Sequence, residues 1–384
     1  MKITFFSTFL THHQLPFCLE MQKKYGDNFK FVSTEKINYE RINLGYKDLD
    51  NEYDFVVKAY ESEELYKKAI QLANDSDIVI MGSTKTDEYI KQRLLDDKVI
   101  FRYYARIFYR GIFSFLDFKN LKIVYNKHFK YRNNKNMYLL CNNGYGPNDF
   151  NRFGMYINKC FKWGYFPETK YYDINELMNR KEKNEYIKIL WVGRFIKMKH
   201  PEYMIKLAKK LIKDGINFKI EMVGSGKLIK KIERQIEKNK LNNYIKLIGA
   251  VQSDKVREFM EKSNIFACTS NKEERWGVVM NEAMNSACAV IANKDIGAVP
   301  VLIENNKNGV IYNGFNEFYN KIVTLIKNKE LRSQISINAY KTISEIWTAR
   351  NAVNNFDIMI NELIRNKNNT IISGPASNAK PVKM

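Results

Sequence analysis

Two successive arrays of short apolar runs, separated by amphipathic segments, constrain the fold of this 384-residue chain more than any other feature. The first array predicts strands at residues 3–7, 29–33, 55–59, 78–82, 99–103 and 137–141, and it closes with 160–166. The second predicts strands at 188–192, 219–223, 245–248, 265–269, 289–292 and 309–312. Apolar residues at helical spacing lie between them, for example at 61–74, 202–213 and 228–239. Continuously apolar strands that alternate with helices predict two parallel sheets, each covered by helices on both faces.

The length and the local composition predict where these two domains begin and end. The polar, charged segment Glu168–Glu185 is typical of an interdomain linker. We therefore predict an N-terminal Rossmann-like domain over 1–180 and a C-terminal one over 186–343. A last amphipathic helix follows over 344–365, and the Asn-, Ser- and Pro-containing residues 366–384 are predicted to be disordered.

Composition excludes several classes of protein. A hydrophobic content of 45% is ample for two cores, but the apolar runs are too short to cross a bilayer. The apolar start Met1–Leu10 is interrupted by Ser7 and Thr8 and lacks a small-residue cleavage site, so a first strand is favoured over a signal peptide. Five cysteines without C-x-x-C spacing indicate neither a zinc site nor a disulfide framework, which favours a reduced, cytoplasmic protein.

The formal net charge of +21 is concentrated in one stretch, residues 102–162. Twelve basic residues lie there against two acidic ones, Asp117 and Asp149. Basic and aromatic residues alternate: Arg102, Tyr103, Tyr104, Arg106, Phe108, Tyr109, Arg110, Phe113, Phe115, Phe118, Lys119, Lys122, Lys127 and Lys130. Three interpretations stay open: solvated lysines over a core of aromatics, an anionic membrane surface, or, least favoured, nucleic acid.

The segment that carries most chemical information runs from Glu274 to Met284. It follows the predicted buried strand at 265–269 and places two carboxylates, Glu274 and Glu282, eight positions apart around a turn. The first would end a strand-to-helix loop and the second would lie inside the helix. The backbone N–H groups of Trp276, Gly277 and Val278 between them would point out of the helix start, where phosphate binds readily. Carboxylates for hydroxyls and amides for phosphate predict a sugar nucleotide as ligand.

This segment resembles the E-x7-E element of retaining GT-B glycosyltransferases, in particular glycosyltransferase family 4 of bacterial polysaccharide and glycan biosynthesis. Two further motifs agree in order and spacing over roughly residues 187–313. The run Ile189–Pro201 resembles the family's strand-Gly-Arg…Lys segment, with Gly193, Arg194 and Lys199 in place. Met222–Gly226 resembles its strand that runs into a small-residue turn. Each motif alone is weak evidence.

The resemblance implies an α/β protein of the GT-B fold, in which two Rossmann-like domains face each other with the active site in the interdomain cleft. The N-terminal domain would bind the acceptor, the C-terminal domain the nucleotide sugar, and the last helix would return to the N-terminal domain. Ligands of such sheets bind at the carboxyl ends of the strands, where all three motifs lie.

The resemblance also assigns roles to single residues. Arg194 and Lys199 would stabilise the leaving diphosphate, while Glu282 would bind the ribose hydroxyls and Glu274 a hydroxyl of the donor sugar. The donor would further contact Gly193, Gly224, Ser225, Gly226, Val251, Trp276, Gly277 and Val278. Each polar assignment has a structural alternative. Arg194 and Lys199 could simply be exposed basic residues, Glu282 could cap a loop, and Glu274 could pair with Arg275.

In the first domain, His12 and His13 follow the first strand, where they could orient an acceptor hydroxyl or transfer a proton, or could equally cap the next helix. Arg102 and Arg106 could bind an acceptor phosphate, and His128 is expected to be solvated. No cofactor or metal is expected. The one D-x-D pair, Asp48 and Asp50, lies early in the first domain and is expected to be solvated too.

The chain departs from the family pattern at three positions. Arg275 and His200 stand where the family usually has glycine, and Val301 stands where it has an acidic residue. The function expected is retaining transfer of a hexose-type sugar from a UDP- or GDP-sugar to a glycan or lipid-linked acceptor. Expected products are capsule, lipopolysaccharide or a related glycan, made by a peripheral protein at the inner membrane face. The alternative is a non-enzymatic membrane- or nucleic-acid-binding protein on a degenerate GT-B scaffold, although no nucleic-acid partner is expected.

Overall fold

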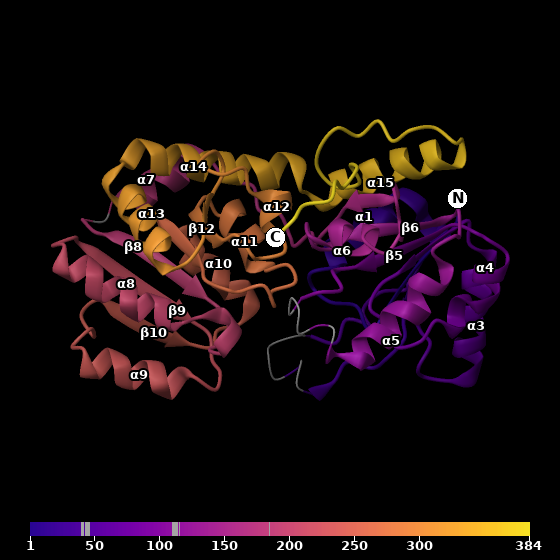
Figure 1. The fold of residues 1–384 in the computed structure, drawn as a ribbon, viewed down its shortest axis with the longest axis horizontal. Coiled ribbons are helices and arrows are strands. Elements are labelled where there is room, and N and C mark those ends of the chain that lie inside the picture. The colour runs from indigo at the N-terminus through magenta and orange to yellow at the C-terminus, as the bar shows by residue number, and fades with distance from the viewer. Residues whose placement is uncertain (40–41, 43–46, 110–113, 115, 184) are drawn as a thin grey trace. The chain divides into compact units, whose positions relative to one another are not determined.

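The computed structural model describes residues 1–39, 42, 47–109, 114, 116–183 and 185–384 (Figure 1). Within these ranges the chain divides into two compact units. The first comprises Met1–Glu168 together with Trp347–Met384, and the second comprises Thr169–Ile346. Arg110, Phe113 and Phe115 of the basic stretch lie outside the described residues. Each unit is built around one sheet.

The N-terminal unit holds a parallel seven-stranded sheet in the order β3-β2-β1-β4-β5-β6-β7. Its strands are β1 (Ile3–Ser7), β2 (Phe29–Ser33), β3 (Val56–Lys58), β4 (Ile78–Met81), β5 (Ile100–Tyr104), β6 (Met137–Cys141) and β7 (Cys160–Lys162). Strand β1 pairs with β2 on one side and with β4 on the other. All five residues of β1 are buried, as expected for a parallel strand that helices cover on both faces.

The helices of this unit connect the strands as crossovers. They are α1 (Leu15–Tyr25), α3 (Glu63–Asp75), α4 (Lys91–Leu95), α5 (Phe118–Lys127), α6 (Gly146–Asn151) and, from the end of the chain, α15 (Ala349–Ile364). Helix α15 packs beside α1, where the hydroxyl of Tyr25 donates to Asp357 over 2.6 Å (Figure 1). It starts at Ala349 and not at Ser344, because Thr348 caps it by accepting from the N–H of Asn351 at 3.0 Å.

The residues after α15 differ from the disordered tail expected from composition. Ala376 and Ser377 are buried, and Asn378 forms an antiparallel bridge with Phe161 of β7. The N–H of Ala376 donates to the carbonyl of Lys162 at 2.8 Å, and the N–H of Lys162 donates to the carbonyl of Ser377 at 2.7 Å. Small side chains and an edge strand with free hydrogen-bonding groups let this polar segment pair, which hydropathy alone does not reveal.

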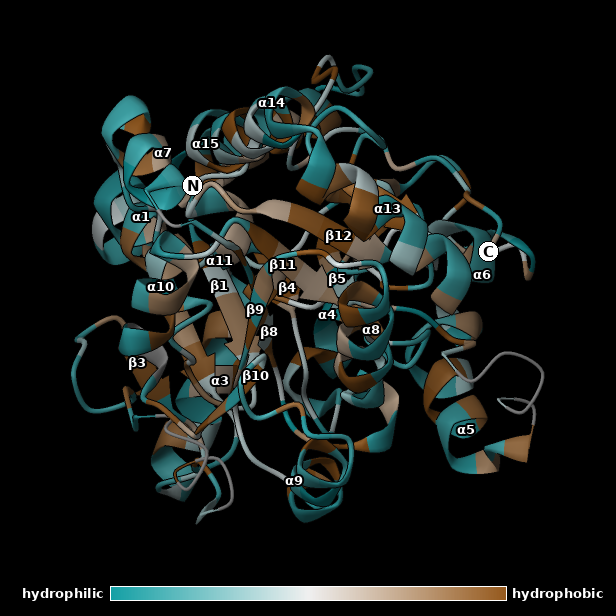
Figure 2. Ribbon diagram, turned by 90° about the vertical axis from the view of Figure 1, so that its left-hand side faces the viewer, coloured by the Kyte–Doolittle hydropathy of each residue, from teal (hydrophilic) through white to brown (hydrophobic). Residues whose placement is uncertain are grey.

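The C-terminal unit holds a parallel six-stranded sheet in the order β10-β9-β8-β11-β12-β13. Its strands are β8 (Ile187–Val192), β9 (Phe218–Val223), β10 (Ile245–Gly249), β11 (Ile265–Cys268), β12 (Ala289–Asn293) and β13 (Val310–Tyr312). The strands are mainly hydrophobic (Figure 2). In β8, Ile189 and Trp191 belong to one core cluster with the helices on that face, while Leu190, on the opposite face, is equally buried. Both sheets and the α/β class predicted from the sequence are therefore confirmed.

The helices of this unit are α7 (Ile174–Glu182), α8 (Glu202–Lys213), α9 (Ile229–Lys238), α10 (Ser253–Glu261), α11 (Val279–Asn285), α12 (Val299–Leu302), α13 (Phe315–Lys327) and α14 (Lys329–Lys341). A π-helical turn, Thr342–Ile346, ends the unit. Among the described parts of the chain, no helix is both long and apolar enough to span a membrane.

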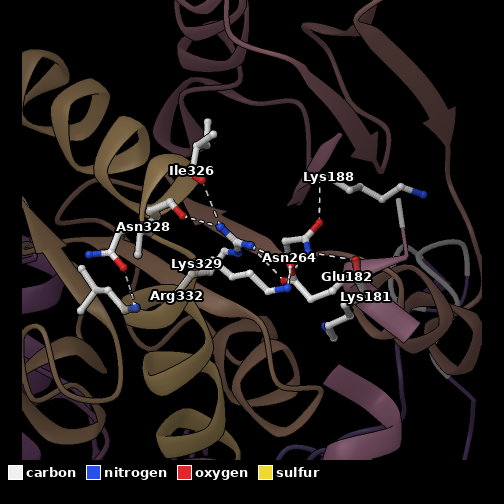
Figure 3. Close-up of polar contacts among 10 residues, drawn as sticks. Lys181, Glu182, Lys188, Asn264, Ile326, Asn328, Lys329 and Arg332 are labelled. Carbon is white, nitrogen blue, oxygen red and sulfur yellow. Dashed lines mark hydrogen bonds and ion pairs between the residues drawn. The ribbon is translucent and has the colours of Figure 1, made fainter. Parts of the chain in front are cut away.

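The segment predicted as a linker is instead an anchored helix of the C-terminal unit. In α7, Glu182 accepts two hydrogen bonds from the guanidinium of Arg332, at 3.0 and 2.9 Å, and lies 3.7 Å from Lys329 (Figure 3). Asn264 joins α7 to the sheet, because its amide donates to the Lys181 carbonyl at 3.1 Å while it accepts from the N–H of Lys188 at 2.9 Å. Residues 169–180, assigned to the first domain from sequence, therefore belong to the second unit.

The polarity of α7 is thus misleading. The Lys181 ammonium is fully buried and donates to the carbonyls of Met260 and Ser263 at 2.7 and 2.6 Å. A buried charge of this kind is stable only when its hydrogen bonds are made, and those partners lie about eighty positions away. The local composition shows that such a residue is charged, but it does not show which hydrogen-bond partners will bury it. Asn184 of the same segment lies outside the described residues.

Candidate functional site

Two glycines join the loop after β8 to the loop after β9. The N–H of Phe195 donates to the carbonyl of Ser225 at 2.7 Å, and the N–H of Gly193 donates to the carbonyl of Val223 at 3.0 Å. A Cβ on Gly224 would lie 2.0 Å from the Gly193 carbonyl oxygen, and both Gly224 and Gly226 have φ in the range that favours glycine. The small-residue turn therefore lets the two loops touch, and it holds the backbone next to Arg194.

The two basic residues of the first motif have different surroundings. Arg194 is exposed, and within the part of the chain that is described its guanidinium makes no ion pair. Lys199, in contrast, is largely buried and forms an ion pair with Glu274, to which the hydroxyl of Ser270 also donates at 3.1 Å. Lys199 and Glu274 lie 75 positions apart, yet they line one small pocket with Ser270 and Gly277. The structure brings two of the predicted residues together here.

A chain of hydrogen bonds fixes the position of Lys199. The indole N–H of Trp191 in β8 donates to the hydroxyl of Thr269 at 2.8 Å, and that hydroxyl donates to the carbonyl of Lys199 at 2.6 Å. The N–H of Asn271 donates to the carbonyl of Met198 at 2.9 Å. The polar residues after β11 were not predicted as site residues, although their place at the carboxyl end of a buried strand could have indicated them.

His200 accounts for one departure from the family pattern. Its backbone is left-handed, with φ 48° and ψ 52°, a conformation in which glycine is unstrained. The imidazole Nδ1 lies 2.8 Å from a carboxylate oxygen of Glu202, and the ring packs against Tyr203. A histidine here keeps the loop shape that glycine would give, because these contacts offset the backbone strain.

The turn between Glu274 and α11 is held from the next loop of the sheet. The N–H of Gly297 donates to the carbonyl of Glu274 at 3.1 Å, and the N–H of Ala298 donates to the carbonyl of Trp276 at 3.3 Å. Gly277 has φ 88°, which favours glycine, and a Cβ there would lie 3.3 Å from a side-chain carbon of Ile296. The Trp276 ring is buried, so only its backbone could reach a ligand. Helix α11 begins at Val279, one residue after the three predicted amides.

Glu282 lies inside α11 with its carboxylate surrounded largely by protein. Burial raises its pKa, and the positive charge of Arg257 on α10 opposes that shift. Arg257 itself donates to the side-chain oxygen of Asn285 at 2.7 Å. Among the described residues no side-chain hydrogen bond to the Glu282 carboxylate is found, so it does not cap a loop. Arg257 was missed from sequence, where it resembles any basic residue of an amphipathic helix.

The other predicted residues of the donor site lie at the carboxyl edge of the same sheet. Ser225 is exposed in the turn after β9, and Val251 is half-buried just after β10. Val301 lies in the four-residue helix α12, after the two backbone donors Gly297 and Ala298. The missing acidic residue therefore leaves the hydrogen bonds to the Glu274–Trp276 turn in place.

His12 and His13 belong to the N-terminal unit, in the turn before α1. Their rings lie 3.8 Å apart between centroids, and His13 packs edge-on against Tyr165 at 6.0 Å. Burial lowers the pKa of His12, so its imidazole is neutral at pH 7 and can accept a proton. The N–H groups of Gln14 and Leu15 both donate to the carbonyl of Thr11, so this backbone turn itself begins α1.

Three residues expected to be solvated or free are buried instead. Asp50 accepts from the N–H of Leu10 at 3.0 Å and from the hydroxyl of Ser33 at 2.7 Å, so it links the loop after β1 to the end of β2. Burial raises the Asp50 pKa. Arg106 is paired with Asp149 at 3.1 Å in the core, and His128 is fully buried with its Nδ1 2.7 Å from the Tyr156 hydroxyl. Long-range partners, absent from any local pattern, account for each.

The basic stretch is consequently not one surface. Arg102 is buried and makes a two-pronged bond with Asp87, at 2.8 and 2.7 Å. Phe101, Tyr103 and Phe108 lie in the core. Helix α5, however, exposes large apolar side chains beside its lysines, with Phe118 77% exposed and Leu116, just before it, 70% exposed.

Comparison with known proteins agrees with the motifs. Residues 173–342 match the family described as glycosyl transferases group 1. An uncharacterized glycosyltransferase of Methanocaldococcus jannaschii is 35% identical over 151 residues, which cover 39% of this chain and 41% of the relative. The poly(glycerol-phosphate) alpha-glucosyltransferase of Bacillus subtilis is 26% identical over 184 residues, or 47% of this chain and 27% of that protein. The chain thus spans less than half the length of these curated relatives.

The fold extends over the whole chain. The crystal structure of HepE from Anabaena in complex with UDP superposes with a TM-score of 0.67 at 20% identity, over 95% of this chain and 100% of that one. Its two-sheet architecture is the GT-B fold predicted here. Residues 173–342, which carry Arg194, Lys199, Glu274 and Glu282 at the strand ends of one sheet, are thus the part of the chain that matches the group 1 glycosyltransferase family.

Proposed function

We propose that the chain transfers a hexose-type sugar from a UDP- or GDP-sugar to a glycan or lipid-linked acceptor, with retention of the anomeric configuration. The observation that carries the proposal is the ion pair of Lys199 with Glu274 at the carboxyl ends of β8 and β11. Arg194 lies exposed five positions before that lysine, and Glu282 follows in α11 with a carboxylate that has no hydrogen-bonded neighbour among the described residues.

This arrangement suits a nucleoside diphosphate sugar. Arg194 offers a guanidinium fork for two phosphate oxygens, and Lys199 offers a compact charge. The Glu282 carboxylate gains hydrogen bonds when ribose hydroxyls donate to it, which offsets the cost of its burial. HepE, which shares the fold, has been crystallised with UDP and with UDP-glucose, which favours a UDP-sugar as the donor here.

In the transfer, the bond between the anomeric carbon and the diphosphate oxygen breaks, and its electron pair stays on that oxygen. Arg194 and Lys199 stabilise the charge that develops there. The acceptor hydroxyl attacks from the same face, and its proton passes to the leaving phosphate, so configuration is retained. Glu274 holds both the Lys199 ammonium and a sugar hydroxyl. His12 and His13 orient the acceptor hydroxyl.

The acceptor is proposed to be a cell-envelope glycan or a lipid-linked precursor, such as that of a capsule or lipopolysaccharide. The name of the B. subtilis relative, a poly(glycerol-phosphate) alpha-glucosyltransferase, supports an acceptor of this kind. An acceptor on the inner membrane face would require the protein to bind an anionic surface.

Helix α5 supports that peripheral binding. Leu116, Phe118, Ile123 and Tyr125 are exposed apolar side chains beside Lys119 and Lys122. Apolar insertion adds to electrostatic attraction of about 1 kcal/mol per well-placed cation. We expect the Leu116→Ser/Phe118→Ser variant to float less with phosphatidylglycerol vesicles than the parent protein.

The matched control is Ile358→Ser/Ile364→Ser, which removes two exposed apolar side chains from α15. Equal flotation of the α5 variant and the parent would refute membrane binding through α5. Equal binding of the parent protein to vesicles of phosphatidylcholine alone would refute the electrostatic contribution.

The transfer itself is tested by incubating the protein with UDP-glucose and GDP-mannose in the presence of EDTA and following release of UDP or GDP. We expect release of one nucleotide without added metal. We expect Arg194→Ala to lower the rate roughly a hundredfold, because it removes charge stabilisation worth about 2.7–4 kcal/mol. Arg275→Ala, which removes a neighbouring exposed arginine outside the assigned roles, is the control. Full activity of Arg194→Ala contradicts the assignment.

The alternative is a non-enzymatic protein that binds a membrane or a nucleic acid on a degenerate GT-B scaffold. Arg275 and Val301, which replace the family's residues, favour it. The burial of Arg102 and Arg106 argues against nucleic acid, because a strand lying on the surface cannot reach guanidinium groups that are buried in ion pairs. This alternative requires that no nucleotide sugar raises the thermal stability of the protein.

A further inference from the structure

A polar pocket lies within the N-terminal unit at the carboxyl ends of β1, β4 and β5. It encloses about 270 Å³ and is lined by Glu35, Thr84, Lys85, Arg102, Lys127 and His128. The sheet order reverses direction between β1 and β4, which are neighbours although β2 and β3 intervene in sequence. The crevice outside the strand ends at such a reversal is where open α/β sheets bind ligands. None of the three donor motifs reaches this unit.

Four buried polar atoms around this pocket have no hydrogen-bond partner in the described part of the chain. They are Glu35 Oε1, Thr84 Oγ1, Arg102 Nε and His128 Nε2. Arg102 and His128 are only 3% and 1% exposed. Buried polar atoms are nearly always satisfied, and each that is not costs about 1–3 kcal/mol. Four such atoms around one pocket indicate a polar ligand that satisfies them together.

The available atoms define the chemistry of that ligand. Arg102 uses both terminal nitrogens on Asp87, which leaves only its Nε donor for another group. Burial and the charges of Arg102 and Lys127 lower the His128 pKa, so the ring stays neutral. Its Nδ1 lies 2.7 Å from the Tyr156 hydroxyl, and in the tautomer whose Nδ1 accepts from that hydroxyl the ring proton is on Nε2. Donors from Arg102, His128 and Thr84 therefore converge with the ammonium of Lys127 on an acceptor-rich, anionic group.

Glu35 provides a hydrogen-bond acceptor in the pocket, in addition to the donors. One of its oxygens pairs with the exposed Lys85 at 2.6 Å, and the other is buried without a partner. A carboxylate oxygen accepts hydrogen bonds but does not donate them, so it needs a hydroxyl or amide of the ligand. Asp87 neutralises part of the local positive charge through Arg102, and Lys127 lies 3.9 Å from it. Lys85, Arg102 and Lys127 still outnumber the two carboxylates by one.

The pocket is also held rigid. The backbone of Gly82 lies against β1, where a Cβ would come 2.9 Å from the Phe6 carbonyl oxygen, and its N–H donates to that oxygen at 2.8 Å. The Lys127 ammonium donates a hydrogen bond to the Thr84 carbonyl. The Arg102 guanidinium donates to the Asp87 carboxylate, which fixes its orientation. Side chains that are held in place by such contacts are arranged in advance for a ligand.

We propose that this pocket binds the acceptor through a phosphate that carries free hydroxyl groups, with Arg102, Lys127, His128 and Thr84 at the phosphate and Glu35 at a hydroxyl. The inference deepens the proposed function, on which it rests, by naming the chemical class of the acceptor as a polyol or sugar phosphate. It also assigns His128 and Thr84, which no motif indicated.

Binding is tested without donor and without turnover. Glycerol 3-phosphate is titrated into the full chain while the imidazole signals of its four histidines are followed by NMR, with His128→Asn identifying the His128 signal. We expect a saturable shift of His128 and none of His200. Glycerol and inorganic phosphate are titrated separately, and each is expected to bind at least about tenfold more weakly, because each satisfies only part of the pocket.

Two substitutions locate the site. Thr84→Val and Lys127→Gln are each expected to raise the dissociation constant of glycerol 3-phosphate about tenfold or more. Lys122→Gln removes the same charge from the exposed face of α5 and should change it less than about twofold. Thr84→Val preserves shape, so it keeps the test valid if Lys127→Gln unfolds. An unmoved His128 signal, or an equal effect of Lys122→Gln, overturns the proposal.

The outcome is separate from that of the transferase proposal. Glu282→Ala should abolish the effect of UDP on thermal stability and leave glycerol 3-phosphate binding unchanged, whereas Thr84→Val should do the reverse. Phosphate that binds as tightly as glycerol 3-phosphate refutes the role of Glu35 and reduces the pocket to an adventitious anion site.

Discussion

At the scale of single residues, the C-terminal unit contains two kinds of charged group. Some are paired with an opposite charge, and others have no hydrogen-bond partner among the described residues. Lys199 and Glu274 neutralise one another inside the small pocket after β8 and β11. Within the described part of the chain, the burial of the Glu282 carboxylate is offset by the charge of Arg257 and not by a side-chain hydrogen bond. A site prepared for a diphosphate and a ribose needs both arrangements, because cations must be held in place while a carboxylate stays open to hydroxyls.

A double-mutant cycle can separate the contribution of the Lys199–Glu274 ion pair to stability from its contribution to the transfer rate. We expect Lys199→Met to destabilise the protein by about 3 kcal/mol, because it leaves the Glu274 carboxylate largely buried without its cation. Lys199→Met/Glu274→Gln should recover most of that stability but not the transfer rate. Urea unfolding and UDP release are the two measurements.

Lys188 and Glu221 provide the matched pair. They lie 3.3 Å apart on β8 and β9 with similarly small exposure. The same cycle on that pair should cost stability in the single variant and leave nucleotide release unchanged. Loss of activity in both cycles would mean that the effect at Lys199 is structural.

The Glu282 carboxylate gives a pH-dependent expectation. Because its pKa is raised in the folded state, the folded protein holds a proton more tightly than the unfolded chain does. Its contribution therefore favours folding below the unfolded pKa and is lost as pH rises through the folded pKa. Glu282→Gln should raise the thermal midpoint at pH 7 and flatten its dependence on pH above the usual range of a glutamate pKa.

The same variant should weaken UDP binding about tenfold or more, since hydrogen bonds to a charged group contribute roughly 1.5–3 kcal/mol. Glu233→Gln, on the exposed face of α9, should change neither quantity. A Glu282→Gln variant that is less stable and binds UDP normally would assign Glu282 to the core.

At the scale of secondary-structure elements, the site depends on how closely loops approach. Strand β9 runs into a turn whose glycines lie against the loop after β8. Helix α11 starts after a turn that the loop following β12 holds by two hydrogen bonds. Parallel strands bring these loops to one edge of the sheet. Because glycine has no Cβ, it then lets the backbones of two neighbouring loops come into contact.

We expect Gly224→Ala to displace the Arg194 loop, because its Cβ would lie 2.0 Å from the Gly193 carbonyl oxygen. The expected cost is about 2 kcal/mol or more in unfolding free energy, with UDP affinity reduced more than stability predicts. Gly215→Ala is the control, since its φ is also positive but its Cβ would meet no atom within 4 Å. Equal loss of UDP binding in both variants would exclude the loop contact as the cause.

At the scale of the whole molecule, two units with separate sheets share one chain that passes from the first to the second and back. Helix α15 and the residues after it complete the N-terminal unit, through Phe356 against Phe101 and through the bridge of Asn378 to Phe161. We expect removal of residues 368–384 to lower the unfolding temperature of that unit by several degrees, for a loss of about 1–3 kcal/mol.

Scanning calorimetry with and without UDP measures this. UDP should raise only the transition of the C-terminal unit, and the truncation should lower only the other. If the truncation changes neither unfolding temperature, residues 368–384 would be the disordered tail that composition predicts.

What the sequence determined by itself is local. Strand positions such as β1, β2 and β6 agree with the predicted runs to the residue, and helix α8 does as well, because apolar periodicity depends only on neighbours in the chain. The three donor motifs were found for the same reason, since each is a strand followed by its own turn. Their place at one edge of a parallel sheet then follows from topology.

What only the tertiary structure decided is where charge is buried. From sequence, His128 and Asp50 were expected to be solvated, Lys181 to lie in a linker, and Arg102 and Arg106 to be available to an acceptor phosphate. Each is buried against partners 15 to 82 positions away. Whether a polar side chain is in water or in the core depends on those distant partners, because only a made hydrogen bond or ion pair offsets its desolvation. The pocket around Arg102 and His128 depends on such partners, and the sequence indicated a phosphate role for Arg102 but not for His128.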